Sequence, residues 1–465
     1  MQDRKKTGAA GFFRPIGALF SAAGEAFAHG DWKTRLSFLV MGFGCLARRR
    51  FVKGLLYLAS EILFILYIAL FGSRYLKDLG TLGTVTRSQV WDGEEQIYWY
   101  VQGDNSMLIL LYSVLSIFFI AIFAAAYFAN IRSAYEAQAE DAAGRPAPGM
   151  RDAAASLLDR KLHTTLLALP TLGVFAFTLL PVIFMILMAF TNFDRAHQPP
   201  GNLFTWVGLQ NFLDIFWMNP GKSKTFYHLL GWTVIWAVFA TFVNYLLGMV
   251  LALMINKKGI RFKAFWRTIF VLSIAVPAFV TLLLMRQILQ DQGAANVILQ
   301  QLGLVSQPVH FLTDGFLAKI SVILVNYWIG IPYSMLITTG ILMNIPADIY
   351  ESARIDGAGP LKQFTAITLP YMLFITTPYL ITQFIANINN FNAIYFLTSG
   401  GPLSLDYYQA GETDLLVTWL YKLTVSFQDY NLASTIGILL FVVCSVVSLV
   451  TFNITMGGRK EETFA

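Results

Sequence analysis

Charged residues are scarce in this chain of 465 residues, where Asp, Glu, Lys and Arg together make up 13%. Soluble domains carry about 25% charged residues and about 45–50% apolar ones, whereas hydrophobic residues make up 56% here. Such a chain has too little polar surface to cover a soluble core. The composition excludes a soluble enzyme, a disordered protein and a nucleic-acid-binding protein, although the net charge is +6. It indicates a protein of the lipid bilayer.

Cysteine and nucleotide-binding motifs are also nearly missing. The two cysteines, Cys45 and Cys444, lie in or beside apolar segments, so neither a disulfide framework nor a zinc site is expected. The five histidines are scattered, and we expect no metal and no cofactor. The phosphate-binding pattern G-x-x-x-x-G-K-[ST] does not occur, because Gly221-Lys222 has no upstream glycine at the required position. The chain is therefore not expected to be an enzyme.

Long apolar runs, in contrast, are abundant. A membrane-spanning helix needs about 20 mainly apolar residues. Eight segments meet this condition: 51–71, 107–129, 165–190, 227–255, 268–289, 318–343, 371–396 and 431–456. We therefore predict an all-α polytopic membrane protein with about eight transmembrane helices. A shorter apolar stretch, 36–47, ends at three arginines, which favours an amphipathic helix at the membrane interface.

The placement of the basic residues predicts the orientation. If the N-terminus is cytoplasmic, the inner connections hold most of the Lys and Arg residues, and the connection 257–267 contains no acidic residue. Cytoplasmic loops carry this excess of positive charge. We therefore expect a multi-pass protein of the plasma membrane with both termini in the cytoplasm. The N-terminus lacks the pattern of a cleavable signal peptide, so we expect it to be retained.

Three parts follow from this plan. Residues 1–50 are predicted to form a cytoplasmic and interfacial segment. Residues 51–150 are predicted to form an accessory helix pair with an outer loop and a cytoplasmic linker, and residues 151–465 hold the six remaining helices. The boundary is placed in a linker rich in turn-forming residues, Gly144, Pro146, Pro148 and Gly149.

The predicted spans contain few ionisable residues. Glu61 lies in the first and Arg286 near the outer end of the fifth. We interpret Glu61 as bonded to a neighbouring donor and Arg286 as reaching the outer lipid headgroups. Proton- or sodium-coupled carriers rely on carboxylates near the membrane midplane. An ion-coupled sugar carrier is therefore an alternative that the sequence disfavours.

Neutral polar side chains instead form two stripes in the later spans. At positions i, i+4 and i+7 of a helix, residues share one face, and the two sets are Asn326, Gly330 and Tyr333, and Gln383, Asn387 and Asn390. Pro332 is expected to kink its helix, and Gly330 to allow a close approach. Amides beside aromatic rings suit a neutral, hydroxyl-rich ligand such as a sugar. The alternative is that these amides hold helices together.

The loop 345–370 carries the most specific pattern. Asp348, after Pro346, is expected to cap a short helix, and Asp356-Gly357-Ala358-Gly359-Pro360 is expected to end it sharply. The loop resembles the EAA loop of ABC importer permeases: Glu351-Ser352-Ala353, Gly357 and Ile367-Thr368-Leu369-Pro370 stand at the expected separations, with Ser352 the one departure. The resemblance implies the type I ABC importer permease fold for 151–465. It also implies a coupling helix that docks on a cytoplasmic ATPase through Glu351, Ser352, Ala353, Asp356 and Gly357.

From the third span onward the chain also resembles the larger maltose/maltodextrin permeases, through the stretches 326–333, 356–360, 387–391, 397–402 and 410–417. This implies a permease subunit of an oligosaccharide importer, with galacto-oligosaccharides as an alternative substrate because those permeases look much alike. The sugar site carried over is Asn326, Ile329, Gly330, Tyr333, Gln383, Asn387 and Asn390, although the family's example has Ser in place of Gln383.

The resemblance implies several partners. They are a second homologous permease, two cytoplasmic ATPase subunits that hydrolyse the ATP, a lipid-anchored extracellular sugar-binding protein, the oligosaccharide itself and membrane lipid; nucleic acid is not expected. The region 191–226 is too short for the large extracytoplasmic domain of Gram-negative members. We therefore expect a Gram-positive source.

Overall fold

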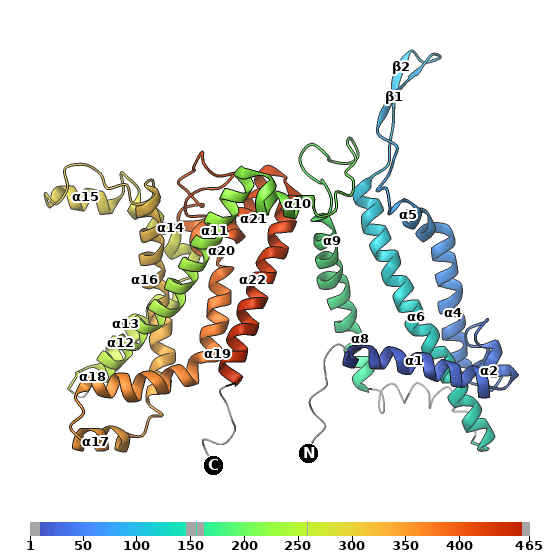
Figure 1. The fold of residues 1–465 in the computed structure, drawn as a ribbon, viewed down its shortest axis with the longest axis horizontal. Helices are drawn as coiled ribbons and strands as arrows, with labels where there is room; N and C mark the ends of the chain where they lie inside the picture. Colours follow the sequence, from blue (N-terminus) through green and yellow to red (C-terminus); the bar gives the residue numbers. More distant parts are fainter. Residues whose placement is uncertain (1–9, 146–154, 156–161, 258, 458–465) are drawn as a thin grey trace. The chain divides into compact units, whose positions relative to one another are not determined.

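A computed structural model describes residues 10–145, 155, 162–257 and 259–457. In this part of the chain, helices make up nearly all of the regular structure, and the named strands form one two-stranded sheet (Figure 1). Seven helices are long and apolar enough to cross a membrane, and a bent helix pair raises the count to eight. The expected all-α membrane fold is confirmed.

Two compact units divide the chain: Met1–Leu187 with Ala196–Trp206, and Met188–Arg195 with Val207–Ala465. The expected boundary at residue 150 and most of its linker lie outside the described residues.

The first unit is built on two antiparallel membrane helices. Its elements are α1 (Ala10–His29), α2 (Trp32–Leu36), α3 (Phe43–Leu46), α4 (Phe51–Tyr67), η1 (Ile68–Gly72), α5 (Ser73–Asp78), β1 (Ser88–Asp92), β2 (Ile97–Val101), α6 (Ser106–Ala142), α8 (Leu162–Val174) and η2 (Phe175–Leu179), where η marks a π-helical turn. Helix α9 (Leu180–Met188) follows and leads into the second unit. Strands β1 and β2 pair antiparallel, with Val90 opposite Trp99.

The continuous interfacial helix expected at 36–47 is wrong. Helix α2 ends at Leu36, and α3 begins only at Phe43. Gly42 between them has a φ of +82°, which residues with a side chain rarely adopt. A Cβ at Gly42 would also overlap the Gly54 carbonyl. The close approach of two backbones therefore sets this turn, and apolar periodicity does not reveal it.

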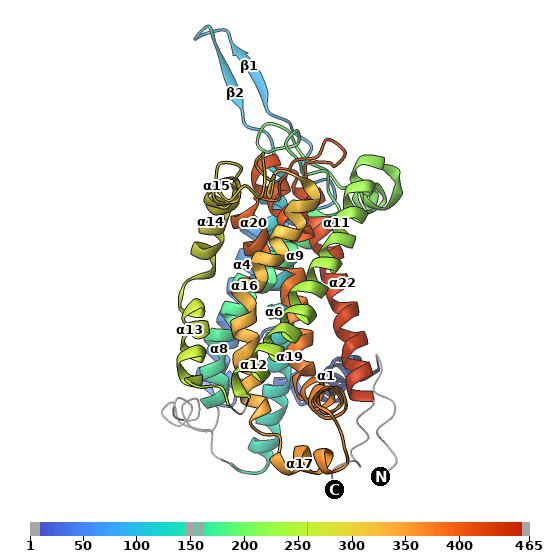
Figure 2. The same ribbon diagram turned by 90° about the vertical axis from the view of Figure 1, so that its left-hand side faces the viewer.

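The second unit contains the later spans. Its elements are α10 (Gln210–Leu213), η3 (Asp214–Met218), α11 (Pro220–Val238), η4 (Phe239–Val243), α12 (Asn244–Asn256), α13 (Lys263–Ala275), α14 (Ala278–Leu289), α15 (Ala294–Gln301), α16 (Gly315–Leu342), α17 (Ala347–Ile355), α18 (Pro360–Gln363), η5 (Phe364–Thr368), α19 (Leu369–Ile388), α20 (Phe391–Leu397), α21 (Leu416–Lys422), η6 (Leu423–Phe427) and α22 (Tyr430–Gly457). Helix α17 lies at one end of this unit, and α15 and α20 lie toward the other (Figures 1 and 2).

Two expected spans differ in detail. The fifth, 268–289, is a pair of helices, α13 and α14, that meet at 90°. Val276 between them is extended, as a residue before proline prefers to be, and Pro277 occupies the N-cap position of α14. The seventh, 371–396, ends at Ile388, and a separate helix α20 begins at Phe391. Pro332, by contrast, lies inside the continuous helix α16.

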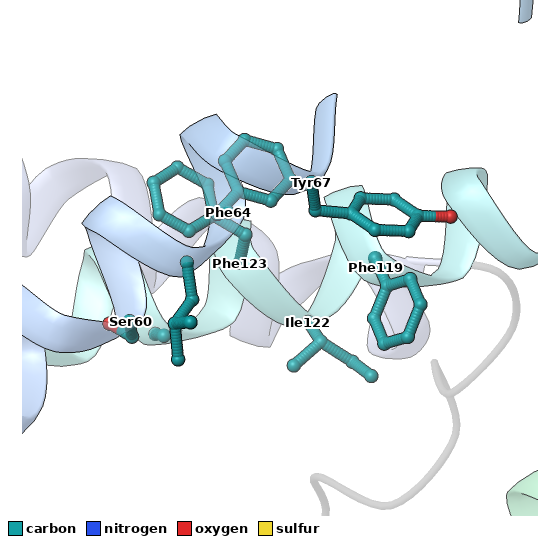
Figure 3. A pocket seen from close by; sticks show the side chains of 8 residues that line it. Ser60, Phe64, Tyr67, Phe119, Ile122 and Phe123 are labelled. Atoms are coloured by element: carbon teal, nitrogen blue, oxygen red, sulfur yellow. The ribbon is translucent and has the colours of Figure 1, made fainter. Parts of the chain in front are cut away.

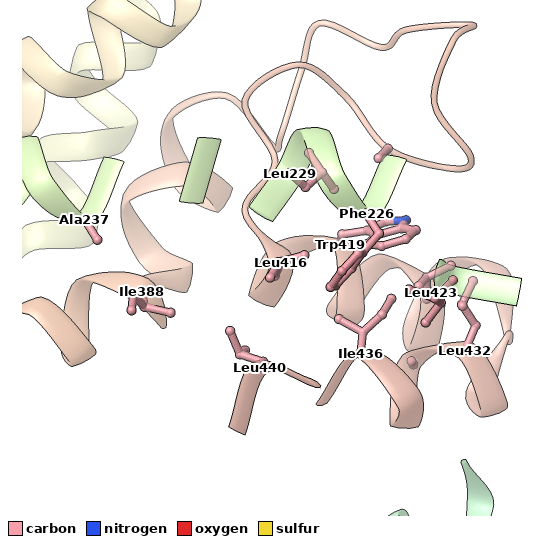
Figure 4. Close-up of a cluster of buried hydrophobic side chains, with 13 residues drawn as sticks. Phe226, Leu229, Ala237, Ile388, Leu416, Trp419, Leu423, Leu432, Ile436 and Leu440 are labelled. Atoms are coloured by element: carbon pink, nitrogen blue, oxygen red, sulfur yellow. The ribbon is translucent and has the colours of Figure 1, made fainter. Parts of the chain in front are cut away.

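A buried apolar cluster joins α11, α19, α21 and α22 (Figure 4). Trp419 is completely buried within it, among Phe226, Leu416 and Ile436. The Trp419 indole donates a hydrogen bond to the Tyr408 carbonyl at 2.9 Å, so its one polar atom is satisfied. This cluster holds together the end of the unit that carries α20 and α21.

Candidate functional site

Helix α17 and the turn after it form the segment expected to couple to an ATPase. Pro346 occupies the N-cap without a side-chain bond, and Asp348 lies inside the first turn. The expectation that Asp348 caps the helix is therefore wrong, although its charge there still favours the helix dipole. The helix ends where expected: Gly357 has a φ of +79°, and its N–H bonds to the Arg354 carbonyl at 3.0 Å.

Among the described residues, one side-chain hydrogen bond joins helix α17 to another element of the unit. The Tyr350 hydroxyl lies 2.9 Å from the Thr368 hydroxyl, at the end of η5. Most of the helix is exposed, including Glu351 and Ser352, and Ile355 is 87% exposed. A tethered helix that presents apolar and charged side chains to its surroundings is suited to docking on a protein partner.

The first polar stripe lies on α16 as expected, but its members differ in surroundings. Asn326 and Ile329 are half-buried, and within the described chain no hydrogen bond is recorded for the Asn326 side chain. Tyr333 is 48% exposed, and its ring centre lies 6.4 Å from that of Tyr379 on α19. Gly330 faces Asn244 so closely that a Cβ would overlap the amide. The stripe thus contains the amide of Asn326 and the exposed ring of Tyr333, which a ligand could contact, and Gly330, which packs against another helix.

The second stripe is interrupted. Asn390 lies beyond the end of α19 and caps α20 by accepting the Ala393 N–H at 3.2 Å, so the expected i, i+4, i+7 face of one helix is wrong at this position. Asn387 donates to the Thr241 hydroxyl at 3.0 Å and accepts from Asn390 at 3.2 Å. These two amides are therefore committed to contacts within the fold. Gln383 is half-buried, with no such bond recorded in the described part of the chain.

Polar residues of the fourth span connect the two stripes, and the sequence reasoning missed them. Thr241 bonds Asn387, and Asn244 packs on Gly330. Tyr245 accepts a hydrogen bond from the Thr376 hydroxyl of α19 at 2.8 Å. The signal available in the sequence was the spacing of these side chains at i, i+3 and i+4 within an apolar run.

The loop between α20 and α21 is fixed by a buried carboxylate. Asp414 accepts the Gly411 N–H at 2.8 Å and the Lys422 ammonium at 2.5 Å, and its side chain is fully buried.

Arg286 of α14 donates to the Ser399 hydroxyl at 3.0 Å, in the loop between α20 and α21. Its guanidinium therefore bonds this loop, which corrects the interpretation that it reaches lipid headgroups. Nearby in the sequence, burial raises the pKa of Asp429, whose carboxylate accepts the Tyr408 hydroxyl at 2.8 Å.

The first unit contains an apolar hollow of about 290 Å³ between α4 and α6 (Figure 3). Its lining includes Phe64 and Phe123, whose rings stack at 3.9 Å, and Ser60 and Tyr67. Tyr67 bonds the Ser116 hydroxyl at 2.9 Å. The hollow offers no charged group for chemistry. Among the described residues, no group of three or more His, Cys, Asp or Glu side chains is arranged to hold a metal.

Known proteins resemble this chain over nearly its whole length. Residues 244–455 match the family described as binding-protein-dependent transport system inner membrane component. A galactooligosaccharide transport system permease of Bacillus subtilis (strain 168) is 35% identical over 426 residues, which are 91% of this chain and 97% of that protein. A maltodextrin transport system permease of the same organism is 35% identical over 438 residues, 92% of this chain and 97% of that protein.

A solved structure supports the same fold. One chain of a bacterial ABC transporter involved in the import of the acidic polysaccharide alginate aligns with a TM-score of 0.51 and 24% identity, over 66% of this chain and 99% of that one. This likeness confirms the expected ABC importer permease fold. Together with the relatives matched at nearly full length, it shows that the chain belongs to the inner-membrane permease components of binding-protein-dependent transport systems.

Proposed function

We propose that this chain is one of two membrane subunits of an ATP-driven importer of neutral oligosaccharides, with maltodextrins as the favoured substrate. The observation that carries the proposal is the match with sugar permeases at 35% identity over more than nine-tenths of the chain. Galacto-oligosaccharides are the second candidate, because the permease named for them is equally similar.

An ion-coupled carrier is the alternative from another class. The scarcity of carboxylates argues against it, since Glu61, in the first span, already accepts the Met41 N–H at 2.8 Å. The exposed α17 is also without a purpose in a carrier that works alone. In the proposed importer, closure of two ATPase subunits on nucleotide moves α17 and reorients the spans, so that the pathway opens alternately to each side. The chain supplies the pathway, and its partner hydrolyses the ATP.

We assign the contact with the ATPase to Glu351, Ser352, Ala353, Asp356 and Gly357. The exposure of this segment supports the assignment, as does its attachment through the Tyr350–Thr368 hydrogen bond. The basic connection 257–267 supports a cytoplasmic position for the same end of the unit. Both termini are then cytoplasmic.

We assign the sugar pathway to Asn326, Ile329, Gly330, Tyr333, Gln383, Asn387 and Asn390. Their surroundings divide the roles. Asn326 and Gln383 retain amides for sugar hydroxyls, and the exposed Tyr333 ring offers an apolar face for a sugar ring. Gly330, Asn387 and Asn390 hold α16, α19 and α20 in place through contacts within the fold.

The remaining partners follow from the family. A homologous permease would complete the pathway, and an external sugar-binding protein would deliver the oligosaccharide. The Bacillus relatives support a Gram-positive cell membrane, where that protein would be anchored by lipid.

The coupling assignment is tested with a matched pair of glycines. Gly357 and Gly259 both have positive φ, and a Cβ at either would meet nothing within 4 Å. Gly357→Trp and Gly259→Trp therefore impose similar backbone strain. In the assembled transporter with its ATPase and binding protein, we expect Gly357→Trp to abolish sugar-stimulated ATP hydrolysis and Gly259→Trp to retain it. Equal activity of the two variants would overturn the assignment.

The sugar site is tested by uptake of labelled maltodextrin into vesicles. Asn326→Ala and Gln383→Ala should lower uptake while assembly and basal ATP hydrolysis persist. Asn389→Ala is the control, because Asn389 is exposed and its amide bonds the Ile385 carbonyl of its own helix and the Cys444 sulfur of α22. Normal uptake by both test variants would return these amides to a role in helix packing. If the unaltered protein takes up galacto-oligosaccharide but not maltodextrin, galacto-oligosaccharide becomes the favoured substrate and maltodextrin is excluded.

A further inference from the structure

The N-terminal part of the first unit exposes several large apolar side chains before the first span begins. We call residues 19–50 the N-terminal collar. Its exposed apolar residues are Leu19, Phe20, Phe27, Trp32, Leu39 and Val40, and Phe27 and Trp32 are 59% and 63% exposed. These residues precede the first span and lie outside every candidate membrane helix. Large apolar surfaces of this kind mark a contact with a protein or a membrane.

The collar is firmly held against α6. Asn130 accepts the Gly42 N–H at 2.8 Å and donates to the Ser37 carbonyl at 2.9 Å. Gln138 accepts the Asp31 N–H at 2.9 Å. The Tyr127 hydroxyl donates to the carbonyl of Phe38 at 2.9 Å. The exposed apolar groups therefore stand on a fixed scaffold.

Two buried arginines complete this scaffold. The Arg48 side chain is 2% exposed and pairs with Asp31 at 2.6 Å. Arg50 pairs with Glu140 of α6. Because α6 is itself a membrane span, these bonds fix the collar at one end of that span.

The position of α1 favours a membrane surface as the occupant. Helix α1 runs crosswise to α4 and α6, near the end of α6 (Figure 1). The Phe20 ring contacts Phe128 of α6 edge-on at 5.1 Å. A crosswise helix at the end of a span lies in the plane of the headgroups. The collar thus contacts an apolar side chain of a membrane span.

The charge of the collar favours anionic headgroups. It contains five basic residues and two acidic ones. Arg48 and Arg50 are used internally, whereas Arg49 is exposed and Lys33 is half-buried. Arg35 bonds the carbonyls of Phe27 and Ala28 at 3.0 Å, at the end of α1. Basic side chains beside an inserted apolar face are typical of helices that bind anionic lipid.

We propose that the N-terminal collar is a membrane-surface element that inserts its apolar face among the headgroups of the bilayer and binds anionic phospholipid through Lys33 and Arg49. The proposal is independent of the transported sugar, because it concerns only the lipid around the first unit. It gives residues 19–50 a role that the transport cycle does not require of them.

A fluorophore attached to Phe27→Cys tests the depth of insertion. The complete transporter, carrying Cys444→Ser, is placed in vesicles with lipids that bear a nitroxide quencher near the headgroup. Cys45 is completely buried and can remain. Glu25→Cys is the control, because Glu25 is exposed and lies on the opposite side of α1 from Phe27.

We expect strong quenching by the lipid at position 27 and stronger quenching by aqueous iodide at position 25. Equal quenching by iodide at both positions would overturn membrane insertion. A label at position 27 that is shielded from both quenchers until the ATPase subunits are removed would also overturn it, and would show that a protein covers the face.

Comparing labelled phosphatidylglycerol with labelled phosphatidylcholine tests headgroup recognition. The affinity for phosphatidylglycerol, measured by quenching of the fluorophore at position 27, should fall roughly fivefold in Arg49→Gln or Lys33→Gln. Each cation near a membrane surface contributes about 1 kcal/mol, which corresponds to that factor. Lys224→Gln, which removes an exposed charge of α11 outside the collar, is the control and should change nothing. Equal quenching by the two lipids in the unaltered protein would overturn anionic recognition.

Discussion

Three glycines in the packed helices α12 and α16 allow a graded test of how tightly the helices of the proposed sugar pathway pack. A Cβ at Gly248 would overlap the Ser334 side chain and lie 2.9 Å from the Met335 nitrogen. A Cβ at Gly330 would overlap only the amide of Asn244. A Cβ at Gly340 would meet nothing within 4 Å. The perturbation is alanine at each position.

The magnitudes follow from what must move. At Gly340, alanine should stabilise the protein by up to about 1 kcal/mol, because alanine favours helix more than glycine does. At Gly330, the Asn244 side chain can rotate away, so we expect a net cost of about 1 kcal/mol, at the low end of the range for overpacking. At Gly248 the obstacle includes backbone, which cannot rotate away, so the helices must separate at a cost of about 1–3 kcal/mol.

Thermal stability of the purified transporter is the assay, measured as the fraction that remains monodisperse after heating. The expected order of stability is Gly340→Ala, then the unaltered protein, then Gly330→Ala, then Gly248→Ala. Sugar uptake should follow the same order for the two destabilised variants, since both glycines lie at the α12–α16 contact. If Gly248→Ala proves as stable as Gly340→Ala, the close approach of these helices is refuted.

Three further outcomes are expected. Tyr350→Phe removes the bond to Thr368 and should lower the coupling of ATP hydrolysis to uptake, with a loss of about 1 kcal/mol in helix docking, measured by the ratio of the two rates. Hydrogen bonds from backbone N–H groups, first that of Val85, lower the pKa of Asp104. The stability that the ionised Asp104 carboxylate contributes is therefore complete above the ordinary carboxyl pKa and is lost as the pH falls. Proteolysis of the outer hairpin should become faster in acid, and acid should have no effect on proteolysis of Asp104→Asn. Arg48→Met should loosen the collar by about 2 kcal/mol, seen as faster proteolysis before α4.

The spans could be predicted because each depends on composition over about 20 residues. The break at Pro277 could also have been foreseen, since the residue before a proline avoids helix. Pro332 gives the opposite result with the same residue type: it is buried inside the continuous α16. Whether a proline ends a membrane helix depends on neighbours that satisfy the freed carbonyl, and the local sequence does not contain them.

The candidate site was predictable only in part. The stripe on α16 follows from helical spacing, but the stripe on α19 assumed that the helix continues through Asn389. Asn390 is itself a good N-cap residue, and this local preference ends one helix and begins the next. The roles of Thr241 and Asn244 depend on tertiary contacts across more than 80 residues. Such contacts cannot be obtained from periodicity.

The fold of the collar could not be predicted from the sequence, because it also depends on contacts between residues far apart in the chain. Its turn depends on Gly42 and on hydrogen bonds to Asn130 and Gln138, which lie 88 and 107 residues from their partners in the chain. The apolar count in 36–47 suggested one helix, whereas the backbone contact with Gly54 imposes a reversal.

The length of α6 has a mechanical consequence. Its 37 residues extend about 55 Å at 1.5 Å per residue, whereas the hydrocarbon core is about 30 Å thick. About 25 Å of the same rigid rod therefore lies outside the core, and Asn130 and Gln138 attach the collar to this part. A change of about 10° in the tilt of the rod, well within the range of membrane helices, displaces a point 25 Å along it by about 4 Å. The second span and the collar therefore tilt together, because these hydrogen bonds join them into one body.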